Sequence, residues 1–489
     1  MSNTFRPIGL AAAVAVVSAG FAGVTSAQEV SSRNVGDLGI VPYYTTANGY
    51  NTGIHIINTT EATQVVKLRL RRGSDSLDAL DFNLIMSPKD EWVGSIQSDE
   101  KGVFVETDDK TCTAPSPNEG TNRFRMPDTF AEGAGEGYIE VIGMAQADQG
   151  TQIAKSALHK AGEPDDCANV RANFFRVDAA NAGMVEFKGV HNAALTTDGT
   201  VANMYTDTPS DALMVTYFTR NKTAGLEYGN NAVMIEGFAS TPMMTNQEAL
   251  LVVDGVPQYD PFNFEQPNLD GGPIGAPGRV GGDADLYDSV IRRVLGASSI
   301  SNDWSNNQSD AFGVNTDWVV TIPGQYLMVD IETLATTGAC AAGSCDTRDI
   351  PVRARVKFYD REETSFTPED GDLVVSPATT ITNGTDLVNE VNVITWSDTP
   401  VLGSQYAQKF EVAIDGASSG WAELSVTSSA AKAPQQVWAA DPNATGSFSS
   451  RGDVVNTAPP IIGFAVWSRN FGDDETRNYG RAVDHAYGS

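Results

Sequence analysis

Gln64-Val-Val-Lys-Leu-Arg-Leu-Arg-Arg72 is the stretch that decides the fold, because it alternates apolar and basic residues with a period of two. Only an extended strand sorts such residues onto two opposite faces. The alternation returns over residues 82–86, just before a Ser-Pro turn. Together the two segments predict an antiparallel sheet with one buried face. The apolar side of the first segment carries Val66, Leu68 and Leu70, and its basic side carries Lys67, Arg69 and Arg71.

A second stretch, Val352-Arg-Ala-Arg-Val-Lys-Phe-Tyr359, repeats the pattern of apolar residues inside and basic residues outside. In both places an apolar strand ending in Ser-Pro follows. This echo indicates a weak internal duplication; the alternative is that any two antiparallel sheets look alike in sequence. The outward residues of the second stretch are Arg353, Arg355 and Lys357.

Two interpretations of the basic rows stay open. In a chain with 62 acidic residues, pairing with Asp or Glu across the sheet is the simpler one. Asp81 is close enough in sequence to be a partner of the first row. Otherwise the six basic side chains form binding strips for an acidic protein partner or a polysaccharide.

Composition bounds the protein class. The chain has 489 residues, which indicates two or three domains, and 41% of them are hydrophobic, which excludes general disorder. Its formal charge is −30, so nucleic acid and anionic membranes are excluded as partners. Such acidity is typical of solubility in a salty external medium, and divalent-cation binding is the alternative.

The first 27 residues are typical of a secretory signal peptide. Arg6 supplies the positive region, 8–24 are apolar and small, and Thr25-Ser-Ala27 fits a cleavage site. We therefore expect an exported chain that starts near Gln28, in the periplasm, at the cell surface or outside the cell. No later segment approaches about 18 uninterrupted apolar residues, so no transmembrane segment is expected after cleavage.

The predicted fold is mainly β, with two antiparallel sandwich-like domains joined by a Gly/Pro-rich linker and one short helix. The N-terminal sandwich spans 28–254 and the C-terminal sandwich spans 302–470. Residues 255–301 form the linker, in which apolar spacing predicts a helix over 284–296. A loose polar tail, 471–489, is expected to follow.

Four cysteines allow three pairings in principle. The simplest pairing joins Cys112 to Cys167 across a long loop and Cys340 to Cys345 across a tight one. An exported chain meets an oxidising compartment, so disulfides are expected. The spacing does not fit a zinc–thiolate site.

Acidic clusters leave a structural calcium site open, without a position for it. Asp283-Ala-Asp-Leu-Tyr-Asp288 holds three carboxylates, but capping of the predicted helix explains them. No stretch matches an EF-hand loop. No cofactor is therefore expected beyond this calcium ion.

No catalytic residue can be named from the sequence. A Gly-x-Ser-x-Gly motif is absent, and His55 and His191 have no telling partner nearby. Tyr43, Tyr44 and Trp92 are expected in the sheet core, and stacking on sugar rings is the alternative.

Four short phrases carry a resemblance that spans most of the mature chain: Ile40-Val-Pro-Tyr-Tyr44, Leu80-Asp-Phe-Asn-Leu84, Thr316-Asp-Trp-Val-Val-Thr321 and Tyr359-Asp-Arg-Glu-Glu363. The chain resembles an uncharacterised family of exported, β-rich bacterial proteins with no established activity. The resemblance implies export and a shared fold, and it brings no catalytic residues.

These observations favour an exported, non-enzymatic surface or extracellular protein that works by binding or assembly. Its partner would be a protein or polysaccharide at the cell surface, or another copy of itself. A polysaccharide- or calcium-binding module is the first alternative, and a hydrolase of extracellular polymers is the second.

Overall fold

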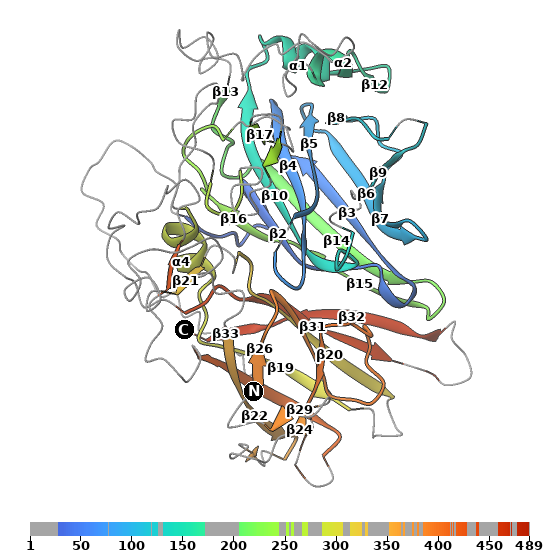
Figure 1. Ribbon diagram of the computed structural model, residues 1–489, viewed down its shortest axis with the longest axis vertical. Helices are drawn as coiled ribbons and strands as arrows, with labels where there is room; N and C mark the ends of the chain where they lie inside the picture. Colours follow the sequence, from blue (N-terminus) through green and yellow to red (C-terminus); the bar gives the residue numbers. More distant parts are fainter. Residues whose placement is uncertain are drawn as a thin grey trace, which may run out of the picture.

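The computed structural model gives a mainly β protein, as the alternating stretches predict (Figure 1). The residues that the structure describes are 28–76, 78–118, 120–125, 131–171, 205–243, 251–253, 256–258, 267–271, 286–306, 313–324, 328–330, 352–362, 365–366, 374–375, 379–380, 385–410, 412, 414, 417–427, 437–439, 458–469, 471 and 477–488. Cys340, Cys345 and the expected signal peptide lie outside these ranges.

Two antiparallel sheets form the N-terminal sandwich, in the upper part of Figure 1. Sheet N1 runs, in spatial order, through β1 (Glu29–Val30), β16 (Val233–Glu236), β2 (Leu38–Thr45), β10 (Glu136–Ala147), β4 (Thr63–Arg72), β5 (Asp78–Met86) and β8 (Cys112–Ala114), and β13 (Tyr205–Thr206) pairs with β10. Sheet N2 runs through β15 (Leu226–Asn231), β14 (Leu213–Asn221), β3 (Tyr50–Asn58), β6 (Glu91–Asp99), β7 (Gly102–Glu106) and β9 (Arg123–Arg125).

The apolar side of β4 faces the sandwich core, as predicted. Val66, Leu68 and Leu70 are buried in one cluster with apolar residues of sheet N2. Tyr43, Tyr44 and Trp92 are also fully buried, which confirms the expectation that they pack in the core.

The other side of sheet N1 is buried as well, so the expectation of one buried face is wrong for this sheet. Nine of the ten residues of β4 are buried. Toward one end, Val65 and Ile85 pack beneath the short helices α1 (Gln152–Ala157) and α2 (Cys167–Arg171). Toward the other end, the described linker residues 267–271 are all buried and contact β4. Elements distant in sequence therefore cover a face that local alternation assigned to solvent.

The C-terminal sandwich lies below the first in Figure 1. Sheet C1 runs through β28 (Ala407–Lys409), β27 (Val391–Thr395), β20 (Val314–Thr321), β31 (Ile462–Arg469) and β32 (Tyr479–Asp484), with β28 parallel to β27. Sheet C2 runs through β23 (Ser365–Phe366), β22 (Val352–Asp360), β29 (Ser419–Thr427), β19 (Ser299–Ser305) and β33 (Ala486–Gly488), and β26 (Thr385–Leu387) pairs with β22.

Sheet C1 is the middle layer of the molecule, because it is apolar on both faces. Trp318 and Val320 of β20 pack with sheet C2 in one cluster. Val319, between them, belongs to the cluster that fills the N-terminal sandwich. The outer face of sheet C2 is thereby left as the face farthest from the N-terminal sandwich (Figure 1).

Buried polar groups join the two sandwiches. Glu136 at the start of β10 is 1% exposed, and its carboxylate accepts hydrogen bonds from the Tyr43 hydroxyl at 2.7 Å, the Gln405 N–H at 3.0 Å and the Ser404 hydroxyl. The Tyr50 hydroxyl donates to the Val401 carbonyl at 2.9 Å. These contacts and the shared apolar cluster make the junction part of the core, since a buried carboxylate needs several donors to be tolerated.

The predicted helix is present as two consecutive turns, η3 (a π-helix, Tyr287–Ile291) and α4 (Arg292–Leu295). Its apolar face is buried, as the spacing predicts. Asp270 holds its start, since its carboxylate accepts from the Tyr287 N–H at 3.3 Å. Asp283 and Asp285, the caps expected from sequence, lie outside the described residues. Gly296 ends the helix in an extended conformation and permits close approach to the Arg292 carbonyl.

Four two-stranded pairs and a short 3-10 turn complete the described elements. The predicted boundary after residue 254 falls inside one of these hairpins, β17–β18. The elements are η1 (Ala47–Gly49), β11 (His159–Lys160) with β12 (Glu163–Pro164), β17 (Leu251–Val253) with β18 (Val256–Gln258), β21 (Met328–Asp330) with β30 (Val437–Ala439), and β24 (Val374–Val375) with β25 (Thr379–Thr380).

The expectation of a loose tail over 471–489 is wrong for most of it. β32 pairs with β31 along its whole length, and β33 pairs with β19. Between them His485 is 4% exposed and bonds the Val319 carbonyl at 2.9 Å through Nε2. The polar composition of the segment concealed two strands at sheet edges, β32 and β33, which keep part of their residues exposed.

Asp317 supplies a test of the junction. Its carboxylate is fully buried and accepts from the Leu402 N–H at 2.8 Å, yet burial raises its pKa from 3.8 to about 6. Between these two pKa values the native state holds more protons than the unfolded chain, so the wild type loses stability as pH rises. For Asp317→Asn, the free energy of unfolding relative to wild type should rise by on the order of 3 kcal/mol between about pH 4 and about pH 7.5.

Urea denaturation across this pH range measures the difference. Asp398→Asn, at a side chain that is 89% exposed, is the control and should shift stability by less than about 0.5 kcal/mol. If the difference in stability between Asp317→Asn and wild type does not change with pH, the pKa of Asp317 is not raised by burial in the folded protein.

Candidate functional site

The first basic row is buried. The side chains of Lys67 and Arg69 are fully buried and Arg71 is 3% exposed. They lie on the face of β4 that points away from the sandwich core. Three carboxylates share this space: Asp78 and Asp81 on β5, and Glu140 on β10.

Each base of this group pairs with a carboxylate, which agrees with the cross-strand interpretation. Lys67 Nζ lies 3.2 Å from Asp81 Oδ1, and Arg71 Nε lies 3.1 Å from Glu140 Oε1. Arg69 Nε lies 3.3 Å from Asp78, and its Nη1 donates to the Pro267 carbonyl at 2.9 Å. The register places Arg69 opposite Asp81, the partner predicted from sequence.

Burial dominates the electrostatics of the group. It lowers the pKa of the Lys67 ammonium, against the opposing effect of Asp81. It raises the pKa of the Asp78 carboxyl to about 6, against Arg69. Three bases and three acids balance within one desolvated cluster, so this row does not form a solvent-exposed docking strip.

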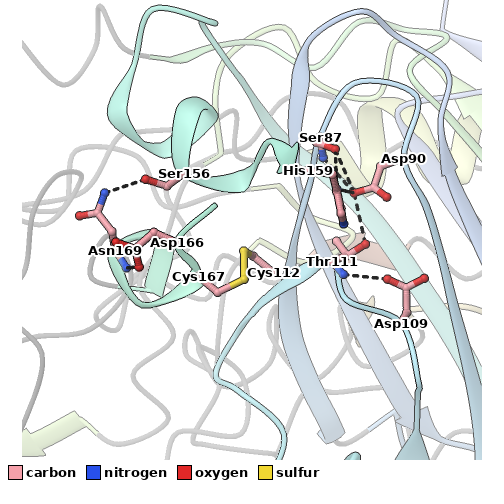
Figure 2. Close-up of a disulfide and its surroundings, with 10 residues drawn as sticks. All are labelled: Ser87, Asp90, Asp109, Thr111, Cys112, Ser156, His159, Asp166, Cys167 and Asn169. Carbon is pink, nitrogen blue, oxygen red and sulfur yellow. Dashed lines mark hydrogen bonds and ion pairs between the residues drawn. A yellow bond between two sulfur atoms is a disulfide. The ribbon is translucent and has the colours of Figure 1, made fainter. Parts of the chain in front are cut away.

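A disulfide joins Cys112 of β8 to Cys167 of α2, as predicted (Figure 2). It ties the segment that carries α1 and α2 onto the edge of sheet N1. The second predicted bridge, between Cys340 and Cys345, lies outside the described residues.

Beside this disulfide, Ser87, His159 and Asp90 lie together (Figure 2). The Ser87 hydroxyl is 3.0 Å from His159 Nδ1, and Asp90 Oδ2 is 3.8 Å from the same nitrogen. A hydrolytic triad uses opposite ring nitrogens for its serine and its carboxylate. Asp90 Oδ2 also accepts from the Ser87 N–H at 3.0 Å and from the Thr111 hydroxyl at 3.2 Å. The group therefore holds a turn against β8 and lacks relay geometry.

The second basic row lies on the outer face of sheet C2, where it meets two aromatic rings. Tyr359 of β22 and Trp421 of β29 stack with centroids 3.9 Å apart and planes at 3°. Lys357 Nζ lies 4.8 Å from the Tyr359 ring centroid. Trp421 is 41% exposed and Arg355 is exposed, whereas the Arg353 side chain lies outside the description. Here the sequence prediction of outward basic residues agrees with the structure for Arg355 and Lys357.

Carboxylates flank the stack on the neighbouring strands. Trp421 lies opposite Tyr359 on one side and opposite Asp303 of β19 on the other. Lys357 lies opposite Glu423. Partial burial raises the pKa of the Asp303 carboxyl, and the charges of Arg361 and Arg481 oppose that shift. We call this set — Arg355, Lys357, Tyr359, Trp421, Glu423 and Asp303 — the C2 face.

Core residues fix the backbone beneath the C2 face. The buried Trp304 indole N–H donates to the carbonyls of Trp421 at 3.2 Å and Tyr359 at 3.3 Å. A Cβ at Gly420 would lie 1.9 Å from the Tyr359 carbonyl oxygen, so only glycine lets the two strands close here. The face is a rigid arrangement of a half-exposed aromatic ring with donors and acceptors on both sides.

Sequence reasoning singled out Arg355 and Lys357 but missed Trp421 and Tyr359 as a pair. Their register across β22 and β29 joins positions that are far apart in sequence. One sequence signal for this pairing was present. Gly420 precedes Trp421 in a strand of alternating pattern, and an isolated glycine in a strand indicates that another backbone approaches closely.

Metal-binding groups and membrane-spanning helices were both sought in the described part of the chain. It holds no group of three His, Cys, Asp or Glu residues placed to bind a metal, and no helix in it is long and apolar enough to cross a membrane. No protein-family model matches the sequence, and no curated protein or solved structure matches it either.

The two basic rows generate a matched test of burial. Arg69→Met should lower the free energy of unfolding by about 3–5 kcal/mol, because it leaves Asp78 and its neighbours as incompletely paired buried charges. Arg355→Met, in the equivalent alternation on the exposed C2 face, should change it by less than about 0.5 kcal/mol. Urea unfolding at neutral pH measures the stability of both variants. Equal losses of stability would contradict the conclusion that Arg69 is buried and Arg355 is exposed.

Proposed function

We propose that this chain is an exported, non-enzymatic protein that binds a hydroxyl-rich neutral polysaccharide through the C2 face. The observation that carries the proposal is the stacked pair Tyr359–Trp421, with Trp421 41% exposed on a face that packs against nothing else described. Exposed aromatic surface that is rimmed by polar side chains is typical of binding sites.

The geometry fits a sugar ring. Tyr359 covers one side of the Trp421 indole, so the other side is turned toward Asp303 on β19. The apolar C–H face of a pyranose can pack on this ring, while its hydroxyls reach the carboxylates of Asp303 and Glu423. Such a combination of aromatic surface with a few placed polar groups is typical of ligand sites.

The charges of the face favour a neutral polymer over an anionic one. Arg355 and Lys357 are balanced by Glu423 and Asp303, and the chain as a whole carries −30. A polyanion would be repelled at long range by this net charge. A mixed set of donors and acceptors suits hydroxyl groups, which both donate and accept.

Export is supported by the signal-like N-terminus and by the Cys112–Cys167 disulfide, which is typical of oxidising compartments. We expect the mature chain to begin near Gln28. Cell fractionation followed by N-terminal sequencing checks this. A chain found in the cytoplasm with residues 1–27 still attached would contradict it.

Trp421→Ala should weaken polysaccharide binding at least about tenfold, which corresponds to ~1.4 kcal/mol, because it removes the aromatic anchor. Affinity electrophoresis in gels that contain dextran, a β-1,3-glucan or alginate measures the retardation. We expect retardation by a neutral glucan, loss of it in Trp421→Ala, and none with alginate.

Leu158→Ala is the control, because Leu158 is 45% exposed on the N-terminal sandwich and is expected to leave binding unchanged. Retardation by none of the neutral polymers, or equal retardation of Trp421→Ala and wild type, would contradict the proposed site. New reducing ends in the incubated polymer would overturn the non-enzymatic assignment and favour the hydrolase alternative.

A further inference from the structure

A cleft of about 440 Å³ lies between the two sandwiches. The N-terminal side contributes β1, β16, the middle of β14 and the end of β15. The C-terminal side contributes α4, the start of β31, and residues 484–487. Its volume falls within the range of small-molecule sites, and a domain junction is a common place for such a site.

One wall of the cleft is apolar and uncovered. Val30 and Tyr487 line it and are 46% and 47% exposed. They are two of the seven large hydrophobic side chains exposed among the described residues. Leu295 and Ile461 continue the wall. Two of the seven on one concave surface mark a place where apolar contact is still available.

Tyr217 contributes a hydroxyl to the same cleft. Its side chain is 4% exposed, and its ring packs on Phe464 with centroids 6.0 Å apart. No hydrogen bond to this hydroxyl occurs within the described ranges. Burial raises the pKa of this hydroxyl, and Asp484 and Tyr487, which line the same cleft, raise it further. A ligand in the cleft can therefore use this hydroxyl as a hydrogen-bond partner.

Asp484 supplies negative charge at the cleft. Its Oδ1 accepts from Asn230 Nδ2 at 2.5 Å, and no base among the described residues forms an ion pair with it. Partial burial raises the pKa of this carboxyl. The Tyr487 hydroxyl is already occupied, since it accepts from the Gly463 N–H at 3.1 Å and donates to the Gly463 carbonyl at 3.3 Å. Asp484 is the one charged residue among those that line the cleft, and the Tyr217 hydroxyl and the amides of Asn34 and Asn231 add neutral polar groups.

We propose that this interdomain cleft binds a small amphipathic cation, whose apolar chain packs on Val30, Leu295 and Ile461 and whose ammonium group donates to Asp484 and to the Tyr217 hydroxyl. An anion of the same size would meet the Asp484 carboxylate as a like charge, and a neutral apolar molecule would leave that charge unpaired. The site is separate from the C2 face, so it stands whether or not the C2 face binds polysaccharide.

Isothermal titration of the full mature protein at about pH 7.5 tests the charge preference. The probes are n-hexylammonium, n-hexanol and hexanoate, which share a chain and differ in the head group. We expect hexylammonium to bind at least about tenfold more tightly than hexanol, and hexanoate to give no measurable heat. Absence of hexylammonium binding, or equal binding of hexanoate, overturns the proposal.

Variants locate the site. Asp484→Asn should weaken hexylammonium binding at least about tenfold, and Val30→Ser should weaken it severalfold, because they remove the charge and part of the apolar wall. Asp165→Asn, which makes the same charge change at an exposed carboxylate paired with Lys160 on the N-terminal sandwich, is the matched control and should leave the affinity unchanged.

Thermal melting without ligand shows that each variant is folded before titration. Tyr217→Phe provides a second readout, because it keeps the ring packing and removes only the hydroxyl, and it should weaken binding severalfold. Unchanged affinity in both Asp484→Asn and Tyr217→Phe overturns the site. A peptide that co-purifies in the cleft, identified by native mass spectrometry, overturns the choice of a small cation as occupant.

Discussion

The carboxylate of Glu136 is the constraint on which the arrangement of the two sandwiches depends. It is buried, so the folded protein must satisfy it with donors, and those donors come from both domains: Tyr43 on one side and Ser404 and Gln405 on the other. Separation of the domains would expose or orphan this group. The junction is therefore specified by polar satisfaction as well as by apolar area, which fixes register more narrowly than apolar contact alone.

Once the junction is set, sheet C1 has no free face. Its alternate residues serve two cores, one shared with sheet C2 and one shared with the N-terminal sandwich. Among the described residues, the two surfaces proposed for binding are the C2 face, opposite the junction, and the cleft at the edge of the junction. Both proposed sites are consequences of layer order, and both rest on rigid strands, which position side chains better than loops do.

Charge is distributed unequally between the inside and the outside of the protein. The chain carries −30 in total, yet the cluster around Arg69 pairs three bases with three acids in a desolvated space. Outside this cluster some carboxylates are also buried, such as Glu136 and Asp317, and the net negative charge of the chain attracts cations over polyanions. Asp484 places part of this negative charge beside an apolar wall, which is the arrangement an amphipathic cation complements.

Local sequence determined most of the strands and the faces of those strands, because a period of two acts within one segment, and it favoured the Cys112–Cys167 pairing without excluding the other pairings. It could not determine exposure. The rows at Lys67 and at Arg355 have the same alternation, but the first is covered by the linker residue Pro267 and by carboxylates of β5 and β10, and the second is covered by nothing described. The Tyr359–Trp421 stack and the Glu136 contacts likewise join residues distant in sequence, and only long-range packing decides such neighbours.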